Sequence, residues 1–182
     1  MTHLESLRSL LPAPEGESPE GINWELISAS WGLNSSFPSD FRQFMEVYGP
    51  GAVEDFLEIL EPQPWDEQQV GDGFSAETKT ARLTWRMEPD RNFDVPPEPL
   101  LIAWGVDSAA DILCWDASAD NPDEWPVVVW DRGTGKWSRY DVGMVEFLHR
   151  TLRADFDECP LRDTSLWGLS EAEFVSAADE DF

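Results

Sequence analysis

The chain has 182 residues, of which 37 are Asp or Glu and 12 are Lys or Arg, so its formal net charge is -25. Such a charge argues against partners that are nucleic acid or anionic membrane, because binding either normally needs Lys and Arg, and it attracts basic proteins. The ten Trp and ten Phe are too many for a disordered acidic chain, so the charge lies on a folded body. High charge that serves solubility alone is the alternative explanation.

The cysteine content and the N-terminus bear on where the protein is located. Cys114 and Cys159 are too few for a disulfide framework or a cysteine-type zinc site. Residues 1–11 lack an apolar core long enough for a signal peptide, and no stretch approaches the ~18 apolar residues of a membrane span. We therefore expect a cytoplasmic protein.

Three short helices are predicted in the first third of the chain. Leucines at helical spacing predict one within residues 1–11, and the Pro, Gly and Glu of residues 12–21 indicate a linker. Asn23 is a favourable N-cap for a second helix that ends at Gly32. A third follows Pro38 and ends at the Gly-Pro-Gly of residues 49–51. Its apolar stripe consists of Phe41, Phe44, Met45 and Tyr48.

The middle of the chain predicts one strand and one ambiguous segment. Residues 55–60 are typical of a short strand that prolines close. Residues 74–87 tolerate a helix, which we favour, although their Thr and Trp also suit a strand. A proline-rich break over residues 96–99 follows.

A run of strands and a final helix are predicted after this break. The strands are residues 100–105, 111–116, 125–131 and 136–140, and a glycine-containing turn at residues 132–135 joins the last two. Short connections favour antiparallel pairing. A closing helix spans residues 143–153.

The order of these elements predicts an α+β fold with an antiparallel sheet of about four to six strands, packed by the N-terminal helices and the closing helix. We divide the chain into an N-terminal helix and linker at 1–21, a main domain at 22–154, and an acidic extension at 155–182 that packs on the domain or frays from it.

Residues that carry catalytic chemistry are not apparent in the sequence. His3 and His149 lie far apart and form no recognisable triad. Asp107, Asp111 and Asp116 invite comparison with a metal site, but they lack EF-hand spacing, and aspartates beside turns commonly bond their own backbone. We therefore predict no catalytic residue, no cofactor and no metal ion.

Four segments resemble the SUKH superfamily in their order and spacing. Residues 37–49, with the sequence FPSDFRQFMEVYG, resemble its hallmark helix, which opens on a hydrophobic-Pro-x-Asp-aromatic pattern and ends in Tyr-Gly. Residues 111–116 and 125–131 are similar to its two central strands, and residues 142–148 to its closing helix. Together they span residues 24–152. The segment between Pro62 and Pro99 and the tail after Asp155 depart from the pattern.

This resemblance implies an α+β fold without catalytic residues. Many bacterial members of the superfamily are immunity proteins that neutralise a toxin, often a nuclease, and fungal members are scaffold-like regulators of cell-wall synthesis. It thus implies a protein partner, which the charge suggests is a basic toxin domain. A regulatory adaptor without a toxin is the alternative. The third possibility is an enzyme, which would need a pocket that holds His149 or carboxylates with perturbed pKa values.

The acidic segment before the third late strand is the candidate contact surface. A nuclease must be basic to hold its substrate, so a carboxylate-rich surface can occupy its site. The alternative is that these acids only solvate a loop and that Trp125 begins a buried strand. The candidate residues, with the tryptophan as an aromatic anchor, are Asp116, Asp120, Asp123, Glu124 and Trp125.

Overall fold

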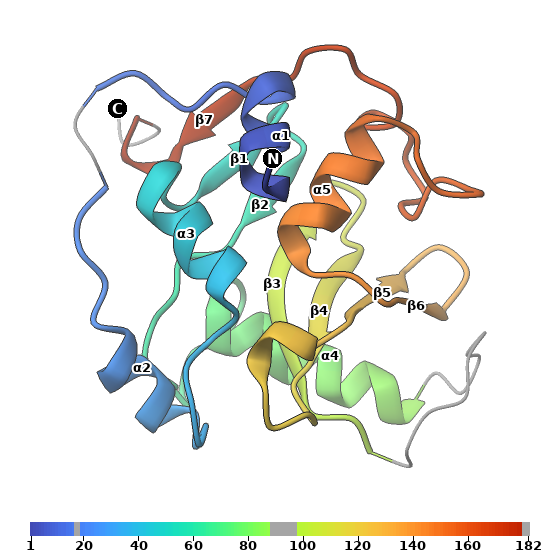
Figure 1. Cartoon of the computed structure of the whole chain (residues 1–182). Helices are drawn as coiled ribbons and strands as arrows, with labels where there is room; N and C mark the ends of the chain where they lie inside the picture. Colours follow the sequence, from blue (N-terminus) through green and yellow to red (C-terminus); the bar gives the residue numbers. More distant parts are fainter. Residues whose placement is uncertain (17–18, 88–97, 180–182) are drawn as a thin grey trace.

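The computed structural model describes residues 1–16, 19–87 and 98–179, and within them it shows an α+β fold (Figure 1). The helices are α1 His3–Leu10, α2 Trp24–Ser30, α3 Ser39–Val47, α4 Phe74–Met87 and α5 Met144–Leu152, with short 3-10 helices η1 Pro122–Glu124 and η2 Ala177–Asp179. The strands are β1 Gly51–Val53, β2 Leu57–Ile59, β3 Leu101–Asp107, β4 Ile112–Asp116, β5 Val127–Asp131, β6 Lys136–Tyr140 and β7 Phe174–Ser176.

These strands form one antiparallel sheet in the order β6-β5-β4-β3-β2-β1-β7. The predicted fold class is confirmed, and the described sheet has 7 strands instead of four to six. Helices α1, α3 and α5 lie on one face, and α4 packs behind β3 and β4 on the other (Figure 1). Every residue of β4 is buried, which is the pattern of a strand covered on both faces.

The predicted helices form for local reasons that the sequence displays. The side chain of Asn23 accepts a hydrogen bond from the backbone N–H of Leu26 at 3.1 Å, and so caps α2. Helix α3 buries its apolar stripe, and the Tyr48 hydroxyl at its end donates to the carbonyl of Leu11 at 2.6 Å. The ambiguous segment 74–87 is the helix α4, as we favoured.

Asp40 joins α3 to α5. Gly143, the N-cap of α5, has no side chain to accept from the first helical N–H groups, and Asp40 Oδ2 takes this role by accepting from the N–H of Val145 at 3.2 Å. A Cβ at Gly143 would lie 2.5 Å from that oxygen, so the glycine leaves room for the contact. Burial, the largest influence, raises the pKa of Asp40, and the charge of Asp123 raises it further. The aspartate of the hallmark motif therefore caps α5 and holds it to α3.

Two strand boundaries differ from the prediction. The strand predicted over residues 55–60 is present as the shorter β2, Leu57–Ile59, because Glu54 and Asp55 have φ angles of 54° and 50° and form the turn between β1 and β2. The prediction that a strand begins at Trp125 is also wrong, since Trp125 ends η1 and β5 begins at Val127. Strand β1 was not predicted from the sequence, because it is only 3 residues long and begins with glycine.

The C-terminal extension takes part in the fold. Strand β7 pairs with β1, and Leu166 and Phe174 are buried in the same core as Leu7. Core residues thus come from all three predicted segments, and the division at 1–21, 22–154 and 155–182 stays a prediction. Part of the proline-rich break and the last acidic residues, at 88–97 and 180–182, lie outside the described residues.

Gly51 permits the close approach of β7. A Cβ there would lie 2.2 Å from the carbonyl oxygen of Val175 and 2.7 Å from the ring of Phe174, a separation that backbone atoms cannot accommodate without moving. We expect Gly51→Ala to lower the free energy of unfolding by about 1–3 kcal/mol through overpacking and to speed proteolysis of the tail. Limited proteolysis followed by mass spectrometry measures this. Gly21→Ala is the control, because no atom lies within 4 Å of that Cβ; equal cleavage of both variants would contradict the assignment.

Candidate protein-binding surface

The acidic loop, which we define as residues 117–124 between β4 and β5, presents some of the predicted contact residues and excludes others. Asp120, Asp123 and Glu124 are exposed. Asp116 is only 7% exposed, and its Oδ1 accepts from the backbone N–H and the hydroxyl of Ser118. The structure therefore brings three of the four predicted acids to the surface, and the fourth fastens the start of the loop.

Trp125 is a core residue in this fold. Its side chain is 4% exposed, and its ring lies 6.1 Å from that of Trp115 and 6.5 Å from that of Phe37. The indole N–H donates to the carbonyl of Ala119 at 2.9 Å. The ring therefore holds the loop against the core, and it does not face a partner as the aromatic anchor that we predicted.

Asp123 fixes the loop to the hallmark helix. Its Oδ1 accepts from the backbone N–H of Ser39 at 2.7 Å, and Pro38, the N-cap of α3, makes no side-chain capping bond of its own. Asn121 in turn accepts from the N–H of Asp123 at 3.1 Å. The loop is thus held from both ends, so Asp120 and Glu124 extend from a fixed frame, which lowers the entropic cost of ordering them in a complex.

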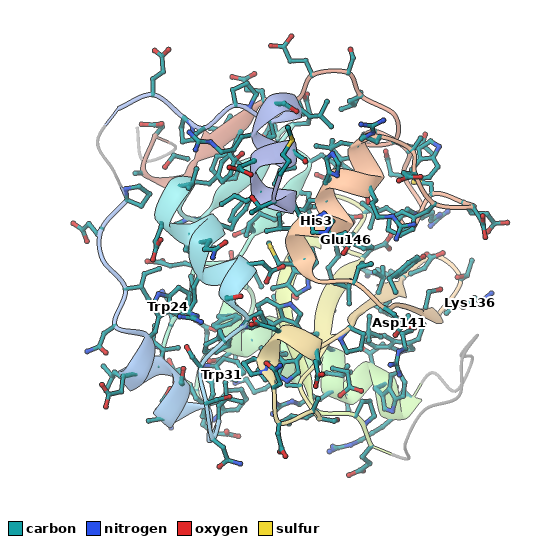
Figure 2. All side chains as sticks on the ribbon, viewed as in Figure 1. His3, Trp24, Trp31, Lys136, Asp141 and Glu146 are labelled. Atoms are coloured by element: carbon teal, nitrogen blue, oxygen red, sulfur yellow. The ribbon has the colours of Figure 1, made fainter. Side chains whose placement is uncertain are left out.

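A partly apolar surface adjoins the acidic loop. The backbone carbonyl of Asp120 lies 3.4 Å from the hydroxyl of Ser35, in the segment that follows α2. Trp24, which begins α2, and Trp31, which follows it, are half-buried, and Figure 2 labels both on the same side of the molecule. Leu26 is 57% exposed. Leu26 is not among the predicted contact residues, although an apolar residue outside the buried stripe of α2 was the available signal.

The two histidines lie near the contact between α1 and α5. Nε2 of His3 is 3.4 Å from the carboxylate of Glu146, and the two side chains point toward one another in Figure 2. Partial burial, the largest influence, lowers the pKa of His149, and the charges of Arg153 and His3 lower it further. This arrangement links two helices.

Asp107 and Asp111, which had invited a metal interpretation, bind backbone groups. Asp107 Oδ1 accepts from the N–H groups of Ala109 and Asp111 at 2.9 and 3.0 Å. Asp111 accepts from the N–H groups of Arg132 and Arg162, so it ties the turn before β6 to the C-terminal extension. Within residues 1–16, 19–87 and 98–179, no group of three His, Cys, Asp or Glu is placed to hold a metal ion.

Comparison with known proteins identifies the family. The model of the SUKH_6 family, described as SMI1-KNR4 cell-wall, matches residues 25–148, which cover the first acid of α2 to the middle of α5. Neither the curated proteins nor the solved structures provide a match. Among the described residues, no helix is both long enough and apolar enough to cross a membrane. Since the match covers well over half of the chain and includes every segment that carried the resemblance, this protein belongs to the SUKH superfamily.

Proposed function

We propose that this protein is an immunity protein that binds and neutralises a basic toxin domain, with a nuclease as the favoured kind. The observation that carries the proposal is the net charge of -25 on a member of the SUKH superfamily whose acidic loop is hydrogen-bonded to Ser39 and to Trp125. A nuclease site is positively charged, so carboxylates that enter it compete with the phosphates of the substrate.

The acidic loop is the proposed contact region. Asp120 and Glu124 supply exposed charge, and half-buried Trp24 with exposed Leu26, both on α2, supplies apolar area. Interfaces commonly combine an apolar centre with a charged rim that speeds encounter. Binding and not catalysis is therefore the proposed activity, and the cytoplasm is its proposed location.

The second candidate is a regulatory adaptor that binds an endogenous protein and meets no toxin. The observation in its favour is the description of the matching family model, which refers to the cell wall. The C-terminal extension would then be the proposed contact region, because exposed Glu171 and Glu173 precede β7 and offer charge to a partner.

The test begins with capture of partners from native cell extract at low and high salt, read by mass spectrometry. The immunity proposal predicts a basic toxin that salt releases, and co-expression with that toxin must restore growth. Recovery of signalling or housekeeping proteins alone would favour the adaptor. Failure to protect cells from the recovered toxin would reject immunity.

For the loop itself, we expect Asp120→Lys with Glu124→Lys to weaken toxin binding by about tenfold or more, because exposed ion pairs contribute ~0.2–1 kcal/mol each and reversal adds repulsion. Calorimetric titration measures the change, and protection of growth reports its consequence. The matched control is Asp157→Lys with Glu158→Lys, an equal change of charge at exposed residues of the extension. Equal losses in both pairs would mean that net charge alone matters, and the loop would not be the contact.

A further inference from the structure

Helix α4 presents apolar side chains on the side that faces away from the sheet. It packs on β3 and β4 through its other side, where Ala81 and Trp85 are buried. Leu83 is 57% exposed and Met87 is 69% exposed. Because an α-helix completes a turn in about 3.6 residues, these two side chains lie one turn apart, opposite the buried side. They contribute little to the core and are free to contact another molecule.

The order of residues along this outer side is that of a contact between two helices. Thr80, Leu83 and Met87 recur at intervals of three and four residues and so form one straight row, which we call the α4 stripe. Lys79 and Arg86 lie seven residues apart on one flank of the α4 stripe. In coiled coils, charged residues at these flanking positions select the partner helix.

The charge of α4 is opposite to that of the whole protein. The helix contains Lys79, Arg82 and Arg86 against one acid, Glu77, in a chain whose net charge is -25. None of the ion pairs within the described parts of the chain involves these three cations. The outer side of α4 is therefore a local positive surface on an acidic protein, and it attracts an acidic partner.

Two of these cations are held in place by neutral groups. Lys79 Nζ donates to the backbone carbonyls of Glu67 and Gln69 at 2.7 and 2.5 Å. Arg82 Nε donates to the carbonyl of Leu101, the first residue of β3, at 2.9 Å. Because a carbonyl carries no net charge, these bonds fix the side chains and leave their positive charge in place.

We propose that the α4 stripe and its basic flank bind an acidic amphipathic helix of a protein partner. The apolar side of that helix would cover Leu83 and Met87, and its Asp or Glu side chains would lie beside Lys79 and Arg86. A second copy of this chain fits less well. Two antiparallel α4 helices would set these cations against one another, and two parallel ones would set Lys79 against an uncharged threonine.

This inference does not depend on the proposed function, because it concerns a partner of the opposite charge. The acidic loop attracts a basic toxin, whereas Lys79 and Arg86 repel it. The two surfaces share no residue, since α4 ends at Met87 and the acidic loop spans residues 117–124. Separate variants can therefore test each surface.

The probe is a synthetic peptide of about three heptads with Leu in its apolar row and Glu on both flanks, where repulsion between copies keeps it monomeric. It is titrated into the isotopically labelled full chain at about 0.15 M salt, where the Debye length of ~8 Å screens distant charges. A peptide of the same composition in scrambled order keeps the charge and loses the apolar row. We expect saturable changes in the amide signals of Leu83, Arg86 and Met87 with the ordered peptide alone. Equal binding of the scrambled peptide, or no change at α4, would overturn the proposal.

The stripe variant, Leu83→Ala with Met87→Ala, removes the apolar contact. We expect it to weaken binding of the ordered peptide at least about tenfold, which corresponds to ~1.4 kcal/mol. The control, Leu26→Ala with Val70→Ala, shortens two exposed apolar side chains outside α4 and should change the affinity by less than about twofold. Equal losses in the two double variants would overturn the assignment to α4.

The charge variant is Arg86→Glu, at an exposed residue of the basic flank. We expect it to weaken binding of the ordered peptide by about threefold to tenfold, because it replaces an attraction by a repulsion. Arg132→Glu makes the same change at an exposed residue between β5 and β6 and should have a smaller effect. If both variants weaken binding equally, net charge governs it and the proposed pairing with Arg86 is wrong.

Two other occupants would also overturn the proposal. A dimer in analytical ultracentrifugation that the stripe variant separates would assign the α4 stripe to a second copy of this chain. Peptide binding that begins only after residues 88–97 are replaced by Gly and Ser would assign it to that segment. By contrast, failure to recover a toxin, with binding of the ordered peptide intact, would reject immunity and leave this proposal standing.

Discussion

Trp115→Ala is expected to lower the free energy of unfolding by about 3–5 kcal/mol, the range for removing a fully buried large aromatic side chain. Trp115 is fully buried, and its ring lies 4.8 Å from that of Phe41 and 6.3 Å from that of Trp104. It joins β4 to the hallmark helix α3, so the cavity would open between the sheet and the helical layer. Such a loss is a large part of the total free energy of unfolding of a folded domain, which is ~5–15 kcal/mol.

Urea unfolding followed by far-ultraviolet circular dichroism measures this cost without relying on tryptophan fluorescence. Trp115→Phe is the conservative variant. It keeps a ring and removes an indole N–H that has no acceptor among the described groups, so its cost should be smaller. Trp167→Ala, at a half-buried position of the extension, controls for loss of a tryptophan. Equal costs for Trp115→Ala and Trp167→Ala would contradict the central place of Trp115.

Asp107→Asn is expected to stabilise the protein at pH 7.5 by up to about 3 kcal/mol and to change its stability little below pH 4. Asp107 is 5% exposed, and burial together with the charge of Asp111 raises its pKa from 3.8 to about 6. Its Oδ2 is buried without a hydrogen-bond donor among the described residues. Asparagine retains the acceptor for the two N–H groups at Oδ1 and removes the charge.

The stabilising effect of Asp107→Asn at high pH follows from how the folded and unfolded states bind the Asp107 proton. Because the folded pKa is the higher one, the folded state binds the Asp107 proton more tightly than the unfolded state does. The stabilisation from this proton is complete below about pH 4 and is lost as the pH rises through about 6. Urea midpoints of the wild type and the variant at pH 4, 5, 6 and 7.5 should diverge over that window. Asp157→Asn is the exposed control, and parallel curves for wild type and Asp107→Asn would contradict the argument.

Several elements could be predicted from the sequence because their causes are local. The N-cap Asn23 and the apolar stripe of α3 determine two helices without reference to the rest of the chain. The hairpin of β5 and β6 follows from alternating apolar residues around a glycine turn. Composition alone gave the net charge, because charge is a sum over residues and needs no coordinates, and the basic partner that we propose is inferred from that charge.

The tertiary structure decided which residues are free to act. Trp125 and Asp116 lie in an acidic, aromatic stretch that favoured a contact surface, yet both are buried. The ring of Trp125 packs near that of Phe37, and the carboxylate of Asp116 accepts from the backbone N–H of Ser118. Strand β7 forms because β1, more than a hundred residues away, offers it an edge beside Gly51. The alignment of Ala52, Glu58 and Val106 across three strands depends on the register of those strands. These features arise from contacts between distant segments, which hydrophobic periodicity and turn chemistry do not encode.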